Sequence, residues 1–266
     1  MASAKSGATM KKTTVGIIGG TNGMGSWLAD LLKTQGCLVH VTGRKTQMTA
    51  TDVARKCDVV VVAVPIAATA VVIKEVGPLM KPDQLLMDLT SLKKEPVALM
   101  LAYSGSDVVG CHPLFGPSVT NPTGHQIVLC RGRGDAWYEW IKTVFEKTGY
   151  GVLEKTPDEH DRMMSIVQTL NHLNTIALGM AIAESGIPLS EVAQFATPIF
   201  KTKMDIVKKI FTETPELYAG IIAGNPDREN VLRTYEKVVQ NIRDLAAIGN
   251  GERLKKAMQA AAKKLF

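Results

Sequence analysis

The fold is decided by one stretch near the start of the chain, Val15-Gly16-Ile17-Ile18-Gly19-Gly20-Thr21-Asn22-Gly23-Met24-Gly25-Ser26. A β-branched run ends in a glycine-rich turn, and the turn opens directly into residues 26–32, whose apolar spacing predicts a helix. Glycines allow the backbone to approach a pyrophosphate, while the helix N-terminus supplies N–H donors and positive partial charge. We therefore predict a dinucleotide-binding turn with contacts from Gly19, Gly20, Thr21, Asn22, Gly23, Met24 and Gly25.

The glycine spacing departs from the strict G-x-G-x-x-G pattern of such turns. If Gly20 and Gly25 are the outer pair, Asn22 occupies the place of the middle glycine. The alternative pattern, G-x-x-x-G-x-G, uses Gly19, Gly23 and Gly25. A loop with only a structural role is the competing interpretation, but the β-rich surroundings favour the dinucleotide turn.

From Thr14 to about Glu154, short β-branched runs alternate with helical stretches. Such alternation predicts a parallel sheet with helices on its faces, as in an α/β, Rossmann-like nucleotide-binding domain. The run from Val59 to Val64 has no polar alternation, so we expect a central strand that is covered on both faces. The expected strands are 15–18, 38–42, 59–64, 85–88, 108–111, 127–130 and 151–153.

Beyond Pro157 the apolar residues follow a three-and-four spacing, which predicts an all-helical domain. Two carboxylates follow Pro157 and favour a helix start there, and we expect this helix to continue to about Ser185. Its apolar residues cover more of the circumference than one amphipathic stripe needs, so we predict a homodimer through this domain. The predicted organisation is a disordered leader (1–12), a Rossmann-like nucleotide-binding domain (13–156) and a helical substrate and dimerisation domain (157–266).

Composition narrows the classes of partner. The 266 residues carry 31 Lys plus Arg against 25 Asp plus Glu, a net charge of +6, and only 5% are aromatic. So few aromatic residues argue against nucleic-acid stacking platforms and favour anionic small molecules as partners. The longest apolar run, from Val59 to Ile73, is too short to cross a membrane. The four cysteines show no disulfide or metal-ligand spacing, so we expect no metal and a reducing, cytoplasmic location.

The end of the second predicted strand indicates which dinucleotide is bound. An NAD-specific site usually places an acidic residue about 20 residues beyond the glycines to hold the ribose hydroxyls. Here Thr42, Arg44 and Lys45 stand in that place. A guanidinium bonds a phosphate bidentately, so we predict a pocket for the 2′-phosphate of NADP, with NAD as the alternative cofactor. Two solvated turn cations are the competing interpretation.

Two polar segments follow neighbouring strands, Asp88-Leu89-Thr90-Ser91-Leu92-Lys93 and His112-Pro113-Leu114-Phe115-Gly116-Pro117. Ligands of open parallel sheets bind beyond the carboxyl ends of the strands, so these segments should face the nicotinamide. With them, the chain resembles the prephenate dehydrogenases of tyrosine biosynthesis from Val15 to its C-terminus. Further motifs of the resemblance are Ala63-Val64-Pro65-Ile66, Glu159-His160-Asp161, Leu170-Asn171-His172, Thr197-Pro198-Ile199-Phe200 and Leu217-Tyr218-Ala219.

The resemblance implies a nucleotide-binding domain, a helical dimerisation domain and a catalytic constellation. By resemblance, His112 accepts the proton of the ring hydroxyl of prephenate while hydride leaves the same carbon for the nicotinamide. The ring carboxylate departs as CO2, and the product is 4-hydroxyphenylpyruvate. A neutral imidazole is suited to this step at physiological pH. The resemblance further implies that Ser91 hydrogen-bonds the same hydroxyl, that Lys93 helps to bind substrate, and that Val64 and Pro65 contact the cofactor.

Other basic residues have two interpretations. His172 matches a family histidine near the substrate, although a structural role fits the sequence equally well. His160 lies twelve residues earlier, about 120° away around one helix, and we interpret it as a structural or capping residue. Many relatives carry a carboxylate-binding arginine where this chain has Lys209, and an ammonium lacks the planar guanidinium fork. We predict that Lys209 and Lys201 contact substrate; an exposed basic helix face is the alternative.

Three other functions are compatible with the residues. An arogenate dehydrogenase would use the amino analogue of prephenate and give tyrosine directly. A deazaflavin-dependent NADP reductase shares a Gly-Gly-Thr start of the glycine turn, but it has no need of Ser91, Lys93 and His112 together. A non-catalytic NADP sensor would keep Arg44 and the glycines and tolerate the loss of His112. The sequence favours an NADP-preferring prephenate dehydrogenase.

Overall fold

The structure is a computed structural model that describes residues 12–247 and 251–266. The chain divides into two compact units, with the division between Asp161 and Arg162. The predicted domain boundary, after residue 156, lies just before this division. The predicted leader, 1–12, falls outside the described residues except for Lys12.

The first unit is built on a sheet whose strand order is β2-β1-β3-β4-β5-β6-β7. The strands are β1 (Thr14–Ile18), β2 (Leu38–Thr42), β3 (Val59–Val62), β4 (Leu85–Asp88), β5 (Asp107–Pro113), β6 (Gln126–Arg133) and β7 (Gly151–Glu154). Adjacent strands from β2 to β5 pair in parallel, as the alternation of strands and helices predicts. All residues of β3 are buried and it has a neighbour on either side, which confirms the expected inner strand.

The predicted parallel sheet is confirmed from β2 to β5, but the parallel pairing does not extend to β6. This strand pairs antiparallel with β5, and β7 then pairs parallel with β6. The cause is the connection, because residues 114–125 join β5 to β6 without a helix, whereas a parallel partner requires a long crossover. As a result, β5 continues past the end of β4. Gly110 pairs opposite the last residue of β4, and the next three residues of β5, including His112, pair with β6.

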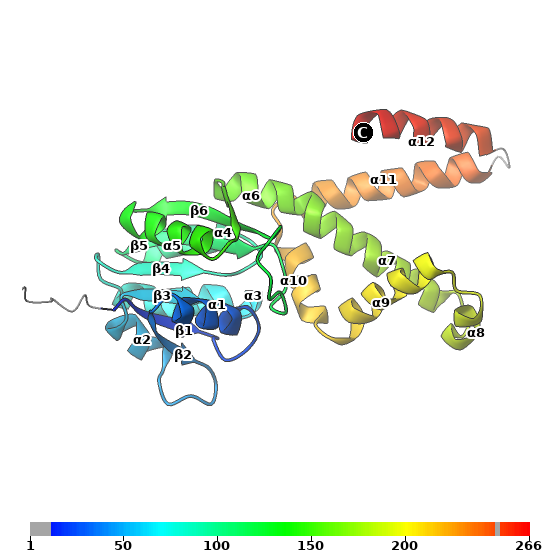
Figure 1. Cartoon of the computed structure of the whole chain (residues 1–266). Helices are drawn as coiled ribbons and strands as arrows, with labels where there is room; N and C mark the ends of the chain where they lie inside the picture. The colour runs from blue at the N-terminus through cyan, green and yellow to red at the C-terminus, as the bar shows by residue number, and fades with distance from the viewer. Residues whose placement is uncertain (1–11, 248–250) are drawn as a thin grey trace, which may run out of the picture. The chain divides into compact units, whose positions relative to one another are not determined.

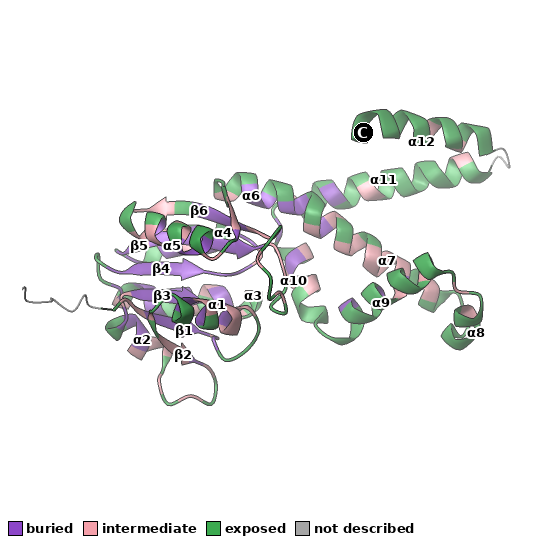
Figure 2. Ribbon diagram, viewed as in Figure 1, coloured by how far each residue is buried: buried purple, intermediate pink, exposed green. Residues whose placement is uncertain are grey.

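Helices cover both faces of the sheet (Figure 1). The helices of this unit are α1 (Gly23–Thr34), α2 (Ala50–Lys56), α3 (Ile66–Val76) with the 3₁₀ turn Gly77–Leu79 after it, α4 (Lys94–Tyr103) and α5 (Ala136–Lys147). One apolar layer joins α1 and α5 to the sheet, and a second joins α2, α3 and α4 to the opposite face. The inner strands lie buried between these layers (Figure 2). This is the expected Rossmann-like architecture.

The turn between β1 and α1 needs its glycines. Gly19 has a φ of +86°, in the left-handed region that glycine tolerates. A Cβ on Gly19 would lie 2.4 Å from the carbonyl oxygen of Ala63, and a Cβ on Gly25 would lie 2.6 Å from the carbonyl oxygen of Gly19. The absent side chains therefore let α1 begin against the carboxyl ends of β1 and β3.

The described residues beyond Pro157 are mainly helical, as predicted. A helical path begins in α6 (Pro157–Met164) and continues through a π-helical segment (Ser165–Leu170) into α7 (Asn171–Glu184). The predicted helix from Pro157 to about Ser185 is thus confirmed, with a π segment that the spacing did not indicate. The other helices are α8 (Leu189–Gln194), α9 (Pro198–Thr212), α10 (Pro215–Gly224), α11 (Arg228–Ala247) and α12 (Gly251–Leu265). Among the described helices, none is long and apolar enough to cross a membrane.

Many apolar side chains of the second unit are exposed. They include Ile166, Val167, Met180, Phe195, Ile199, Val238, Val239, Ile242 and Met258. Figure 2 shows that exposed residues dominate α11 and α12, in contrast to the buried strands of the first unit. Exposed apolar surface of this extent is typical of an interaction surface.

We predict that Gly25→Ala lowers the free energy of unfolding by about 1–3 kcal/mol, because the new Cβ overpacks against the backbone of the glycine turn. Chemical denaturation followed by circular dichroism measures the change. Gly105→Ala is the matched control, since a Cβ there meets nothing within 4 Å, and its effect should stay within about 0.5 kcal/mol. Equal effects of the two substitutions would contradict the proposed close approach.

Candidate active site

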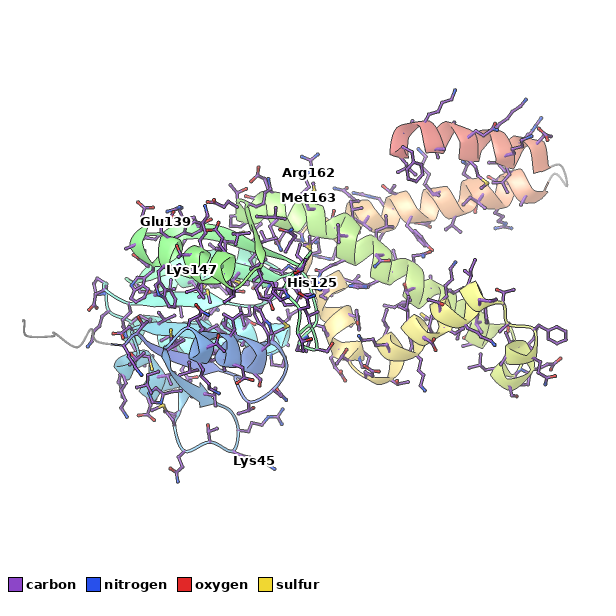
Figure 3. The ribbon with its side chains drawn as sticks, in the orientation of Figure 1. Lys45, His125, Glu139, Lys147, Arg162 and Met163 are labelled. Atoms are coloured by element: carbon purple, nitrogen blue, oxygen red, sulfur yellow. The ribbon has the colours of Figure 1, made fainter. Side chains whose placement is uncertain are left out.

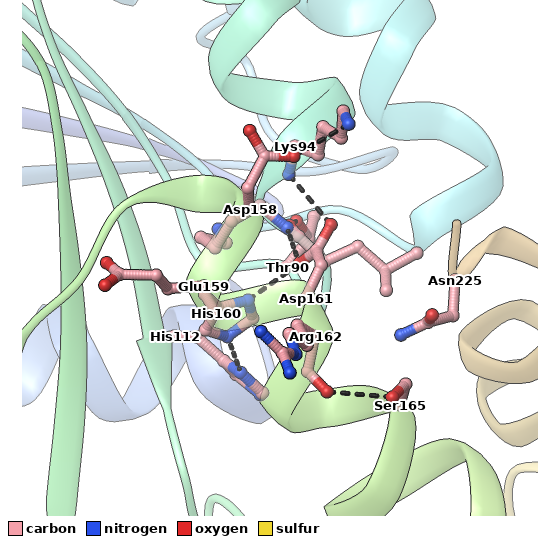
Figure 4. Close-up of polar contacts among 12 residues, drawn as sticks. Thr90, Lys94, His112, Asp158, Glu159, His160, Asp161, Arg162, Ser165 and Asn225 are labelled. Atoms are coloured by element: carbon pink, nitrogen blue, oxygen red, sulfur yellow. Dashed lines mark hydrogen bonds and ion pairs between the residues drawn. The ribbon is translucent and has the colours of Figure 1, made fainter. Parts of the chain in front are cut away.

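A cluster of buried polar residues marks the carboxyl ends of β4 and β5. Asp88 is the last residue of β4, and His112 is the residue before the end of β5. Both side chains are buried, as are those of Lys93, His160 and Asp161. Figure 4 shows His112, His160 and Asp161 in succession. The cluster lies at the edge of the sheet where open α/β folds bind their ligands.

One half of the cluster is an ion pair between Lys93 and Asp88. The Lys93 ammonium pairs with Oδ2 of Asp88 and donates a hydrogen bond to the carbonyl oxygen of Cys111 at 2.9 Å. The backbone N–H and the hydroxyl of Thr90 donate to the same carboxylate oxygen at 2.9 and 2.6 Å. The pair therefore ties the end of β4, the loop after it and β5 together.

The position of Lys93 does not fit the predicted contact with substrate. Both side chains of the Lys93–Asp88 pair have 0% exposure, so the ammonium is committed to protein groups and has no surface to offer a ligand. The physical reason is that a buried carboxylate needs a paired cation. Ser91 lies two residues earlier, half-buried in the same loop.

The other half of the cluster is a chain of hydrogen bonds behind His112. Nδ1 of His112 lies 2.8 Å from Nε2 of His160, and Nδ1 of His160 lies 2.7 Å from Oδ1 of Asp161 (Figure 4). The backbone N–H groups of Lys93 and Lys94 donate to the two oxygens of Asp161 at 2.8 and 3.0 Å. These amides belong to the start of α4, where a carboxylate is stabilised by the helix dipole.

The surroundings of His112 and Asp161 favour a neutral imidazole at the first residue and a charged carboxylate at the second. Burial, and after it the neighbouring His160 and the Lys93 ammonium, hold the pKa of His112 well below its usual 6.5. Burial alone would raise the pKa of Asp161, but hydrogen bonds from His160 and the two backbone amides lower it below its ordinary value. At neutral pH, His112 is consequently a neutral imidazole and Asp161 a carboxylate.

The hydrogen bonds that link His112, His160 and Asp161 are not predicted by the sequence. Helical geometry separates His160 from His172, and on that basis the sequence predicts a structural or capping role for His160. The signal that could have found it is the adjacency of His160 and Asp161 at the start of a helix, since a neighbouring carboxylate orients an imidazole. The structure brings His160 to His112 across 48 positions of sequence, which no local pattern reports.

Aromatic rings connect the segment after His112 to the glycine turn. Phe115 stacks on Tyr150 with ring centroids 5.1 Å apart and meets Trp27 of α1 edge-on at the same distance. Nε1 of Trp27 donates to the hydroxyl of Tyr150 at 3.1 Å. The loop that follows the candidate base is therefore packed against the first helix of the dinucleotide turn.

The glycine turn fits a dinucleotide phosphate. A Cβ on Gly19, Gly20 or Gly25 would meet backbone or side-chain atoms at less than 3 Å, so the backbone itself forms the surface. α1 starts at Gly23 after the N-cap Asn22, and the first N–H groups of a helix face outward as donors. Val64 packs beside Gly19, and Pro65 is the N-cap of α3. Val64 thus lies against the glycine turn, and Pro65 follows it in sequence.

The residues expected to select the cofactor lie next to this turn. A Cβ on Gly43 would lie 3.0 Å from the side chain of Thr21, so the end of β2 reaches the glycine turn. Thr42 is buried at the end of β2, while Arg44 and Lys45 are exposed on the loop that follows. Figure 3 shows Lys45 on this outer loop. The two cations beside the glycine turn are therefore accessible to an anion.

The predicted substrate residues of the helical region lie in the second unit. The ring of His172 meets Tyr218 edge-on with centroids 4.7 Å apart, and burial lowers the pKa of His172. Lys201 and Lys209 are exposed on α9. The chain's nearest basic neighbours on that helix, Lys203 and Lys208, are exposed as well.

Comparison with known proteins covers both units. Residues 34–154 match the family model described as prephenate dehydrogenase, nucleotide-binding domain. Residues 156–260 match prephenate dehydrogenase, dimerization domain. The chain belongs to the prephenate dehydrogenase family. The sequence resemblance is thereby confirmed, and the family match to the first unit begins beyond the glycine turn.

Relatives and solved structures agree with this family. A probable arogenate/prephenate dehydrogenase of Methanocaldococcus jannaschii is 34% identical over 96% of this chain and 62% of its own length. The T-protein of Haemophilus influenzae is 31% identical over 83% of this chain and 59% of its own length. The chain thus spans about three fifths of these relatives. A prephenate dehydrogenase from A. aeolicus, crystallised with hydroxyphenyl propionate and NAD+, has the same fold, with a TM-score of 0.78, 19% identity and coverage of 96% and 98% of the two chains.

We predict that Lys93→Met lowers the free energy of unfolding by about 3–5 kcal/mol, because it leaves the Asp88 carboxylate buried without its cation. The double variant Asp88→Asn with Lys93→Met removes both charges and should recover much of the loss. Urea denaturation of the three proteins measures both effects. A Lys93→Met protein as stable as the original chain would show that the ion pair contributes little.

Proposed function

We propose that this protein is an NADP-preferring dehydrogenase that converts prephenate to 4-hydroxyphenylpyruvate by oxidative decarboxylation. The observation that carries the proposal is His112, a buried and neutral imidazole at the same edge of the sheet as the glycine turn. A base in this position stands where a dinucleotide-binding sheet holds its reactants. Membership of the family supports the reaction class.

In the proposed reaction, His112 and Ser91 have different roles. NADP, when bound, supplies the acceptor for the hydride. Nε2 of His112 accepts the proton of the ring hydroxyl as hydride leaves the carbon that bears it, and Ser91 holds the same hydroxyl. Burial keeps the imidazole in its neutral, proton-accepting form. Loss of the ring carboxylate as CO2 makes the ring aromatic, so the step is irreversible.

For the anionic groups of the substrate we propose residues of the helical unit. Lys209 takes the place of the family arginine and pairs with a substrate carboxylate, and Lys201 supplies a further positive charge. Both side chains are exposed on α9, so their ammonium groups are accessible to an anion. His172 lies near the substrate in this proposal.

We further propose that the protein is a homodimer through its helical unit. The exposed apolar residues of that unit support this arrangement, because a second copy would remove them from water. The family model that matches residues 156–260 is itself described as a dimerization domain. Sedimentation measurements on the purified chain test the proposal.

The deciding experiment follows the absorbance of reduced nicotinamide after the protein is mixed with NADP and either prephenate or arogenate. We expect turnover of prephenate, and loss of that turnover by about 10²- to 10⁴-fold in His112→Asn, because general-base assistance is removed. Binding of NADP and thermal unfolding should change little. His40→Asn is the control, since this histidine lies on β2 outside the polar cluster.

Each outcome of this assay is informative. Faster turnover of arogenate would show that the preferred substrate is this amino analogue and not prephenate. Turnover of neither substrate would overturn the proposed function. Activity of His112→Asn within about threefold of the original chain would show that His112 is not the base.

The cofactor assignment has its own test. We predict that Arg44→Ala weakens NADP binding by roughly 10- to 100-fold, because a charge-assisted hydrogen bond is worth about 1.5–3 kcal/mol. NAD binding should hardly change, since NAD lacks the 2′-phosphate. Arg55→Ala, at an exposed position of α2, is the control, and fluorescence titration measures the dissociation constants. Equal weakening of both cofactors would contradict the assignment of Arg44.

A further inference from the structure

The cluster behind His112 has more ionisable groups than proton abstraction alone needs. We propose that His160 and Asp161 form a closed proton relay with His112, in which the substrate's proton is held at His160 during the reaction and then returned. The inference rests on the proposed function and deepens it. His160 and Asp161 act through His112 and are positioning residues, not catalytic ones.

The hydrogen bonds fix the direction of the relay. Asp161 is a carboxylate, and both its oxygens already accept backbone N–H groups at the start of α4. The 2.7 Å contact with His160 therefore requires Nδ1 of His160 to carry the hydrogen. In neutral His160 the other nitrogen, Nε2, then has a lone pair, and Nδ1–H of His112 donates to it across 2.8 Å.

The hydrogen on Nδ1 of His112 decides which of its ring nitrogens accepts the substrate's proton. With its hydrogen on Nδ1, neutral His112 has its basic lone pair on Nε2, the nitrogen on the opposite side of the ring from His160. Orientation of an imidazole by a hydrogen bond at its other nitrogen is what selects the reactive tautomer. The chain from Asp161 through His160 thus chooses which nitrogen of His112 accepts the proton.

Charge favours onward transfer of the proton. Both rings are buried, so burial disfavours an imidazolium at either position. The Lys93 ammonium, which is itself neutralised in part by Asp88, further disfavours the charge at His112. The same charge at His160 lies against the Asp161 carboxylate. Lys94, at the start of α4, is exposed and pairs with Asp158, so it adds little to the field inside the cluster. The position beside Asp161 is the better place for the positive charge.

The protons balance over the reaction. Nε2 of His112 takes the hydroxyl proton, Nδ1–H of His112 passes to Nε2 of His160, and the positive charge rests on His160 beside Asp161. Hydride leaves with two electrons for the nicotinamide, and the electron pair of the lost carboxylate enters the ring and reaches the oxygen as a phenolate. The phenolate then takes a proton back from Nε2 of His112 as both transfers reverse. No proton is gained or lost overall, so a buried relay needs no outlet to solvent.

The test uses His160→Gln, a substitution that separates orientation from proton storage. The Gln carbonyl reaches the place of Nε2 and accepts the hydrogen bond from His112, but an amide does not hold a proton at neutral pH. We expect kcat for the preferred substrate to fall by roughly 10²-fold, with the KM, NADP binding and melting temperature nearly unchanged. His40→Gln is the matched control and should leave kcat unchanged.

Nitrogen NMR of the histidine rings gives a readout that does not depend on turnover. In the full-length protein labelled with ¹⁵N-histidine, we expect both His112 and His160 to carry hydrogen on Nδ1. The His160 signal should disappear in His160→Gln, while His112 keeps its hydrogen on Nδ1. This pattern tests the hydrogen-bonded chain even if neither prephenate nor arogenate is the substrate.

The outcomes separate the relay from the proposed function. If the original chain turns over neither substrate, the proposed function is wrong and the relay loses its reaction, whatever the nitrogen pattern. If the chain is active but His160→Gln retains kcat, His160 only orients His112 and the relay is overturned. Hydrogen on Nε2 of His160 would also overturn it. A lower kcat with the expected nitrogen pattern supports it.

Discussion

The buried ion pair between Lys93 and Asp88 is the contact on which the carboxyl end of the sheet depends. Each group would be strongly destabilising alone, because a charge without a partner is very unfavourable in a protein interior. Together they join β4 to β5 through the carbonyl of Cys111, and they fix the start of α4. The backbone of that helix start in turn holds Asp161. The orientation of His112 is therefore secured from two sides by one network.

This network shows that a residue within a family motif does not always contact a ligand. The polar run after β4 is recognisable in sequence, and it does lie at the expected edge of the sheet. Its lysine nevertheless serves the protein interior, with its ammonium withdrawn from solvent. A motif locates a functional region, whereas the partner of each side chain decides whether it faces a ligand or supports a neighbour that does.

Much of the fold follows from local sequence physics. The glycine turn, the alternation of β-branched runs with helices and the change to helical spacing at Pro157 each reflect backbone constraints within a few residues. The direction of β6 does not, because it depends on what residues 114–125 build between two strands. The contact of His112 with His160 escapes prediction for a related reason. It arises when the start of α6 packs against β5, a tertiary event that leaves no periodic signal.

The antiparallel pairing of β6 has a consequence for the entropy of substrate binding. In a wholly parallel sheet, the residues beyond the end of β4 would belong to a loop, and fixing each residue of a loop removes about 1–2 kcal/mol of conformational freedom. Here His112 lies past that end but opposite Val128 of β6, inside a two-stranded ribbon. The backbone of His112 is already ordered in the folded protein. A ligand that binds beside it would therefore lose less binding free energy to ordering this segment. The strand that departs from the expected topology is the one that holds His112 in place.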